Sequence, residues 1–506
     1  MPRSRRTLAV LATLAAGALA LTACGGGGSG GGGEAAADQS LTFVPGIFPV
    51  SLDIANYPAE EGAQLAVQQT LQTLVTFDGE EATPVLAESW EYTTPTELTF
   101  ALRDDVTFSD GTPFTSADVK ASLERYIAAD KAFGVLLAAI ADIRADDEHT
   151  ITLVTSEPVG TLVGTMSLIW IGQADRINDD AYWLAPVGTG PFVIDEYAAD
   201  DHVSYTRNED YWGEKPSLTS LELVNIPETA AQITALETGE VDAVGSIPPD
   251  QIANVSSLSD VTFEQVDGIS YYFIWFNQER EPFNDVRVRQ AMSHALNIEQ
   301  TIPDLFGDAA AVAGAPITQA VFGATAQDQP EYNPDLAKQL LAEAGYPDGF
   351  RTTMHWPTAG GPNIQSMAKA FISDWAKVGI TVEPLEKERA QWLQDFGSLN
   401  WDLNLQTNST PTGDADYTLN RLYTCAAERM GYCSPELDAV LAEARASLDQ
   451  DERKGLYATA NEILWTDVPG IWPADLRSNI AYRNTVTGLE LPANNRPDFA
   501  TVTITE

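Results

Sequence analysis

Basic residues, histidine and cysteine are scarce in this sequence of 506 residues. Lysine and arginine together number 28 against 73 aspartates and glutamates, so the formal net charge is −45. A surface this acidic repels phosphate backbones, and we therefore expect no nucleic acid among the partners. The four histidines are scattered and lie far in sequence from the two late cysteines, so we also expect no metal site.

Motifs of the common hydrolases are lacking as well. The sequence has no His-Glu-x-x-His zinc pattern, and Asp449-x-Asp451 lacks the glycine that a calcium loop needs. Residues 27–31 match the letters of a nucleophile elbow, but they lie in a glycine run without the strand–turn–helix context. We therefore expect no enzymatic activity and no cofactor.

The apolar run from Leu8 to Ala23 is shorter than the roughly 20 residues of a spanning helix. It follows a basic start, and small residues precede Cys24, a pattern that resembles a bacterial lipobox. Residues 1–23 are predicted to be a lipoprotein signal peptide, after which Cys24 is acylated. An ordinary signal peptide followed by a chance cysteine is the alternative.

The segment after Cys24 is almost pure glycine, and residues 24–38 are predicted to be a flexible tether. The protein is then expected at the cell membrane, lipid-anchored on the extracytoplasmic face. Of the 28 basic residues, 3 lie in the signal, so the remainder has 25 basic against 73 acidic residues, about −48. In this oxidising compartment Cys425 and Cys433 are expected to form a disulfide, with two free thiols as the alternative.

Strand and helix patterns alternate along the rest of the chain. Alternating apolar residues from Leu98 to Leu102 predict a strand, and helices are predicted from Thr115, Asp285, Asn333 and Ser434. The Thr115 helix runs to Asp130, with Val119, Leu123, Tyr126 and Ile127 on its apolar face; the Asp285 helix runs to Asn297. This alternation predicts an α/β protein with mixed sheets covered by helices.

A series of segments in a fixed order identifies a family. They are Phe108–Thr115, Asp118–Arg125, Val187–Phe192, Asn208–Pro216, Ala235–Asp242, Phe276–Ala291 and Leu340–Phe350. Together they resemble the family 5 extracellular solute-binding proteins of ABC importers, which include dipeptide, oligopeptide and nickel binders. The arginines of the Asp285 helix, Arg287 and Arg289, are expected to be solvated or salt-bridged.

The resemblance implies a two-lobed, periplasmic-binding-protein-like clamp of the large class, with an extra subdomain and a hinge between the lobes. The implied domains are a lobe I core (39–57, 184–268 and 478–506), the lobe I extra subdomain (58–183) and lobe II (269–477). The hinge crossings are expected at 266–272 and 475–482. Closure around a ligand would shift the population toward the closed form.

In the peptide-binding relatives an aspartate in a Gly-Asp loop holds the ligand ammonium. The matching position here is Asp414, with Asp416 as second choice; a solvated acidic loop is the alternative. Dipeptide binders also use an arginine for the ligand carboxylate, in a segment before a helix with the sequence Asp-Trp-Ala-Lys, which is present here as residues 374–377. Residues 355–363 contain no arginine, which favours an oligopeptide over a dipeptide.

Further ligand-binding candidates are drawn from the same region and from the aromatics. Gln406 and Asn408 lie in a stretch expected to be extended, where a peptide could pair as an added strand. Tyr417, Trp356, Tyr272 and Tyr57 could contact a ligand, although aromatic side chains more often fill cores.

The function implied by the resemblance is that of the extracytoplasmic substrate-binding subunit of an ABC importer. It would be a monomer that captures a peptide or other small-molecule solute and delivers it to the permease subunits. The alternatives are a binder of a non-peptide solute such as a metal chelate or sugar, and a secreted enzyme or surface sensor on the same fold.

Overall fold

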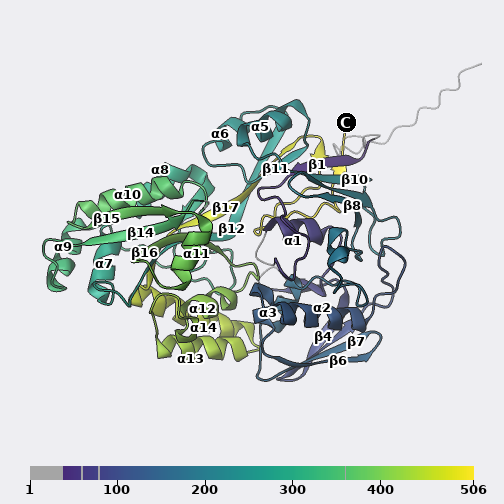
Figure 1. Ribbon diagram of the computed structural model, residues 1–506, viewed down its shortest axis with the longest axis horizontal. Helices are drawn as coiled ribbons and strands as arrows, with labels where there is room; N and C mark the ends of the chain where they lie inside the picture. Colours follow the sequence, from purple (N-terminus) through teal and green to yellow (C-terminus); the bar gives the residue numbers. More distant parts are fainter. Residues whose placement is uncertain (1–37, 58–60, 78–79, 359) are drawn as a thin grey trace, which may run out of the picture.

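The computed structural model describes residues 38–57, 61–77, 80–358 and 360–506. Figure 1 shows two lobes: lobe I holds most of the chain before residue 261 together with the C-terminal segment, and lobe II holds the chain between about 270 and 476. The predicted signal peptide, Cys24 and nearly all of the predicted tether lie outside the described residues. No helix in the described part of the chain combines the length and apolar character that crossing a membrane would require.

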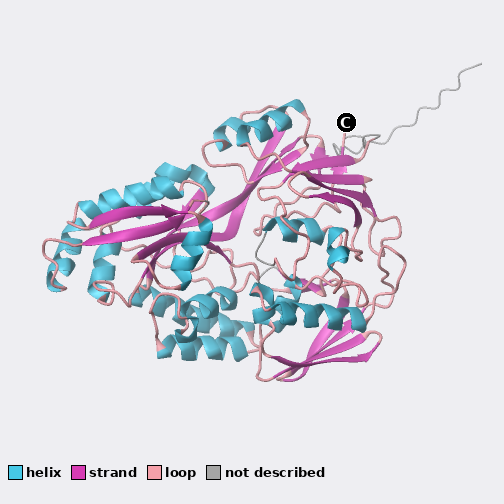
Figure 2. Cartoon of the chain, in the orientation of Figure 1, coloured by secondary structure: helices cyan, strands magenta, loops and turns pink. Residues whose placement is uncertain are grey.

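One mixed sheet runs through both lobes. Its strands in spatial order are β15 (Thr381–Lys387), β14 (Arg351–Pro357), β16 (Leu403–Ser409), β12 (Val261–Phe276), β17 (Gly470–Arg483), β11 (Ala243–Gly245), β1 (Ser40–Val44), β10 (Ser220–Val224), β9 (His202–Arg207) and β8 (Phe192–Ala198), with β13 (Ala310–Val312) beside β17. β1 is parallel to β10 and β11, and β14 is parallel to β15 and β16, whereas the other pairs are antiparallel. Helices cover this sheet (Figure 2), which confirms the predicted α/β class.

The long strands β12 and β17 carry the chain between the lobes. They pair antiparallel from Val261 opposite Arg483 to Trp275 opposite Gly470, and the register shifts between Asp267 and Ser270. Residues 271–276 of β12 are buried in lobe II, whereas residues 261–266 are only half-buried. Both segments in which hinge crossings were predicted lie on these two strands, whose shared register shift interrupts the regular ladder.

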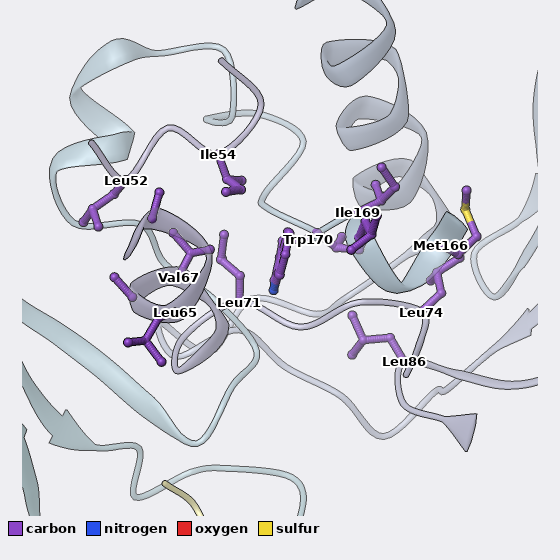
Figure 3. Close-up of a cluster of buried hydrophobic side chains, with 14 of the residues drawn as sticks. Leu52, Ile54, Leu65, Val67, Leu71, Leu74, Leu86, Met166, Ile169 and Trp170 are labelled. Carbon is purple, nitrogen blue, oxygen red and sulfur yellow. The ribbon is translucent and has the colours of Figure 1, made fainter. Parts of the chain in front are cut away.

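Lobe I carries a second sheet of four strands in the order β4 (Ala87–Thr94), β5 (Glu97–Leu102), β7 (Thr150–Thr155) and β6 (Ile140–Asp147). The other elements of lobe I are α1 (Glu61–Gln68), β2 (Val75–Phe77), β3 (Ala82–Pro84), α2 (Ser116–Ala129), α3 (Ala132–Leu136), α4 (Leu162–Thr165), α5 (Thr229–Thr238), α6 (Ile252–Val255), β18 (Val486–Thr487) and β19 (Thr503–Ile504). A large apolar core joins the two sheets, and Figure 3 shows the part of it between Leu52 and Trp170.

The helices of lobe II cover the two faces of its part of the large sheet. They are α7 (Val286–His294), α8 (Ile298–Phe306), α9 (Pro334–Glu343), α10 (Ile364–Ala376), α11 (Arg389–Gly397), α12 (Ala415–Tyr423), α13 (Pro435–Ala446) and α14 (Gln450–Asp467). One core cluster includes Leu403, Leu405 and residues of α7 to α10. The other includes Phe273, Trp275 and residues of α12 to α14.

Three sequence predictions about helices need correction. Ile127, expected on the buried face of α2, is 37% exposed because the helix turns that position outward. The helix expected over residues 285–297 ends at His294, and a second helix begins at Ile298. Arg289 is buried rather than solvated or salt-bridged, and its guanidinium donates to the carbonyl oxygens of Phe283, Asp467 and Val468 at 2.6–2.9 Å.

Candidate functional site

Two cavities lie between the lobes. The hinge-side cavity has a volume of about 540 Å³ and is bounded by both long strands, with Ile269 and Ser270 from β12 and Leu476 from β17. The subdomain-side cavity has a volume of about 420 Å³ and lies between the extra subdomain on one side and α12 and α14 on the other. Tyr417 lines both cavities, so its side chain, in the first turn of α12, lies between the two spaces.

Asp414, the predicted ammonium anchor, already has a cationic partner. Its Oδ2 accepts from Arg453 Nη2 at 2.5 Å, and its Oδ1 accepts from the Tyr457 hydroxyl at 3.3 Å. Burial raises the pKa of the Asp414 carboxyl, and the positive charge of Arg453 opposes that rise. The charge that we expected a ligand to supply therefore comes from α14.

Asp416, the second choice, is also paired within lobe II. Arg445 Nη2 donates to its Oδ2 at 2.9 Å, and Asn420 Nδ2 donates to its Oδ1 at 2.6 Å. The Asp416 N–H in turn donates to Asp414 Oδ1 at 2.9 Å, which caps the start of α12. Both aspartates line the subdomain-side cavity but are buried, so the alternative of a solvated acidic loop is wrong.

The other predicted ligand-binding residues are spread over the cleft, the core and the surface. Asn408 lines the hinge-side cavity, and Gln406 is buried on the same strand just behind it. Tyr272 and Trp356 pack in the lobe II core and line neither cavity. Tyr57 is 46% exposed and also lines neither one. Contact of these side chains with a ligand stays a prediction.

The lobes touch directly beside the subdomain-side cavity. The Gly160 N–H of lobe I donates to the Arg445 carbonyl of lobe II at 2.7 Å, and Lys454 Nζ lies 2.8 Å from Glu80 Oε1. A Cβ built on Gly160 would lie 1.8 Å from the Ser447 carbonyl oxygen, so the backbones are in close contact. The structure is therefore a closed arrangement of the two lobes around the cavities.

The arginines of this region were missed by the sequence analysis. Arg453 and Arg445 lie on helices 39 and 29 residues after the aspartates that they pair with. Arg421 lies one turn after Tyr417 on α12, and its guanidinium carbon is 4.8 Å from the Tyr417 ring centroid. The spacing of Tyr417 and Arg421 by four positions was the only local signal available.

Lobe II also contains a disulfide and a buried histidine. Cys425 and Cys433 are joined by a disulfide that closes the loop after α12. Burial and, to a smaller extent, the nearby positive charge of Lys387 lower the pKa of His355 to about 4, so the imidazole is neutral at physiological pH. Among the described residues, no group of three or more histidine, cysteine or acidic side chains is arranged to hold a metal ion.

Two lobes joined by two long strands, with cavities lined from both sides, define a two-lobed solute-binding protein. Residues 81–429 match the family described as bacterial extracellular solute-binding proteins, family 5 Middle. Because this match spans more than half of the chain, the protein belongs to that family of transporter substrate-binding proteins.

Relatives with known ligands resemble the chain over most of its length. It is 29% identical over 510 residues to heme-binding protein A of Haemophilus influenzae, covering 91% of this chain and 92% of that protein. It is 25% identical over 462 residues to the dipeptide-binding protein of Escherichia coli, covering 84% and 86%. The structure of the periplasmic binding protein DppA from Helicobacter pylori in complex with the peptide STSA matches with a TM-score of 0.78 and 25% identity, covering 92% of this chain and 98% of that one.

Proposed function

We propose that the protein captures peptides in the space between its lobes and delivers them to the permease of an ABC importer. The observation that carries the proposal is an unpaired strand edge at the hinge-side cavity. β16 pairs with β12 from Leu403 to Ser409, but its pairing with β14 covers only Leu403 and Asn404. Within the described sheet, the edge of residues 405–409 that faces away from β12 therefore has no strand partner.

A peptide backbone is suited to this edge. Thr407, Asn408 and Ser409 line the hinge-side cavity, so an extended ligand could lie along them and exchange backbone hydrogen bonds. Backbone pairing tolerates many side chains, because it uses only the N–H and C=O groups that all peptides share apart from proline. Such tolerance fits a nutrient importer.

We favour an oligopeptide over a dipeptide. Tyr417 lines both cavities, so a ligand longer than one cavity could pass its side chain and continue into the next. The relative from Helicobacter pylori is named in complex with a four-residue peptide, and the relative from Escherichia coli is named for dipeptides. These names support peptide binding here and leave the preferred length to experiment.

The proposal is tested with purified protein lacking residues 1–23 and pools of peptides from two to six residues. We expect an increase in melting temperature and a change in tryptophan fluorescence with peptides of three residues or more. The free energy of unfolding should increase by RT ln(1 + [L]/Kd) as the peptide concentration rises. Absence of any response across all pools, from protein unfolded and refolded to remove bound solute, would overturn the peptide assignment.

A non-peptide ligand is the second candidate, because the chain is 29% identical to a protein named for heme binding. Titration with hemin, followed by absorbance, separates the two possibilities. A saturable change in hemin absorbance, together with no response to any peptide, would indicate that the ligand belongs to the heme class instead.

We also propose that the protein is tethered to the membrane through an acylated Cys24. The support is the sequence pattern before that cysteine. Cells expressing the full chain should incorporate radiolabelled palmitate into the protein and retain it in the membrane fraction. The variant Cys24→Ala should lose both the label and the membrane association, and label retained in that variant would refute the tethering site.

A further inference from the structure

Arg421 is a cation at the ligand cavity without an acidic partner. It lines the hinge-side cavity, and its Nη2 donates to Asn408 Oδ1 at 2.6 Å. Its Nε is buried and has no hydrogen-bond partner. In the described part of the chain, no carboxylate oxygen lies within 4.0 Å of its guanidinium.

The other charged side chains of this cavity do not balance Arg421. Arg477 is already paired with Asp267 at 3.0 Å, and Arg389 is exposed on α11. Among the described residues, Glu61 is the one carboxylate of the lining, and burial raises its pKa, which disfavours its charged form. The lining is thus left with a positive excess, in a chain whose formal net charge is −45.

Unsatisfied hydrogen-bond donors lie on the sheet face beside Arg421. Asn408 and Gln406 alternate with the core residue Leu405, so they share the face to which Arg421 is bonded. The side-chain Nε2 of Gln406 has no hydrogen-bond partner within the protein. The residue is only 8% exposed, so water has little access to it. An amide NH₂ and a guanidinium N–H can only donate, so the orphaned groups next to Arg421 call for an acceptor. Farther along the same face, Asn404 has both its side-chain NH₂ and its side-chain oxygen buried without a partner.

A second arginine adds positive potential to the same corner. The Nε of Arg429, on the loop closed by the disulfide, is also buried without a partner. Burial lowers the pKa of Arg429, and the charge of Arg421 lowers it further, which places the two guanidinium groups within electrostatic range. Two unneutralised cations beside orphaned donors are costly unless an anion joins them.

We propose that Arg421 binds a carboxylate of the ligand, so that the hinge-side cavity selects peptides with an accessible anionic group. The inference depends on the proposed function only for placing the ligand in this cavity. A carboxylate accepts hydrogen bonds through both oxygens and matches the planar fork of a guanidinium. The carboxylate could come from an aspartate or glutamate side chain or from the C-terminus of the peptide.

The test measures the affinity of four tetrapeptides by calorimetry: Ala-Glu-Ala-Ala and Ala-Gln-Ala-Ala, each with a free and with an amidated C-terminus. The wild type is expected to bind the peptide without a carboxylate about 10- to 100-fold more weakly than the best carboxylate-bearing one, the range for hydrogen bonds to charged groups. Which substitution causes the loss identifies the source of the carboxylate.

Three variants assign this selectivity to the site. Arg421→Gln should remove it, and Arg421→Lys, which keeps the charge without the fork, should retain part of it. Arg351→Gln is the matched control, because Arg351 is exposed at the far end of β14 and its loss changes the net charge equally. All variants are checked for unchanged melting in the absence of ligand.

The outcomes separate this inference from the peptide assignment. Equal binding of peptides with and without a carboxylate, or equal effects of Arg421→Gln and Arg351→Gln, would overturn the carboxylate site and leave peptide binding intact. If no peptide binds, glutarate replaces the peptides as the probe. A melting shift with glutarate that Arg421→Gln abolishes would support the site without the peptide function, and no shift would show that the orphaned donors bind only water.

Discussion

Removing the charge of Asp414 should lower the stability of lobe II, because Arg453 would be left buried without a counter-ion. The side chains of Asp414 and Arg453 are 6% and 4% exposed, and their charged atoms are 2.5 Å apart. Breaking such a pair from one side costs about 3–5 kcal/mol, since the remaining charge keeps its desolvation penalty. Asparagine is the informative replacement, because its side-chain oxygen can still cap α12 at the Asp416 N–H.

The assay is urea denaturation followed by tryptophan fluorescence, with ligand affinity measured in parallel. Asp414→Asn should lower the free energy of unfolding of lobe II by about 3–5 kcal/mol. The double variant Asp414→Asn with Arg453→Met should recover much of that loss, because the uncompensated charge is gone. Lys454→Gln is the surface control: its pair with Glu80 is largely exposed, so we expect a change below about 1 kcal/mol.

The same experiment decides between the two roles considered for Asp414. If it held the ligand ammonium, as the sequence predicted, Asp414→Asn would weaken binding strongly and leave stability almost unchanged. The ion pair with Arg453 instead predicts a loss of stability first, with a matching recovery in the double variant. A stable Asp414→Asn protein with abolished peptide binding would refute the structural argument.

Two further predictions concern closure and pH. In Gly160→Val the added side chain would collide with the backbone of lobe II and keep the residue 160 N–H from the Arg445 carbonyl. X-ray scattering should therefore show lobes that stay apart when ligand is present, and a compact liganded form would contradict this. Burial raises the pKa of Asp475 from 3.8 to about 7. The folded protein then holds a proton that the unfolded chain releases, so stability should fall by up to about 4 kcal/mol as pH rises from 4 to 7. Asp475→Asn should flatten that dependence in melting curves recorded across this range, and an unchanged slope would exclude Asp475 as its source.

Local interactions explain why several helix starts could be predicted from the sequence. Asn333 accepts a hydrogen bond from the Leu336 N–H at 3.0 Å, and Ser434 accepts one from Leu437 at 3.3 Å, both within one turn. The Thr115 N–H likewise donates to Asp118 at 2.8 Å. Each of these bonds joins residues three positions apart, so the sequence contains all the information needed.

The site could not be predicted in the same way, because its decisive contacts join distant parts of the chain. The Gly-Asp loop located Asp414 near the cleft, but its partner Arg453 is 39 residues away on another helix. Nothing in the sequence around Asp414 distinguishes a carboxylate that awaits a ligand from one that is already paired. For the same reason Arg421, which has no acidic partner, could not be singled out among the arginines.

The direct contacts between the lobes are too weak to hold them closed alone. The backbone hydrogen bond at Gly160 and the hydrogen bond from Gln450 Nε2 to the Glu80 carbonyl contribute about 0.5–1.5 kcal/mol each. The exposed pair of Lys454 and Glu80 contributes about 0–1 kcal/mol. These small gains are opposed by the conformational freedom that two lobes connected through β12 and β17 have in the open form. A ligand that touches both walls of the hinge-side cavity adds contacts only in the closed form and so shifts the population toward it. Because the unpaired charge in that wall is positive, closure should respond to the charge of the solute as well as to its shape.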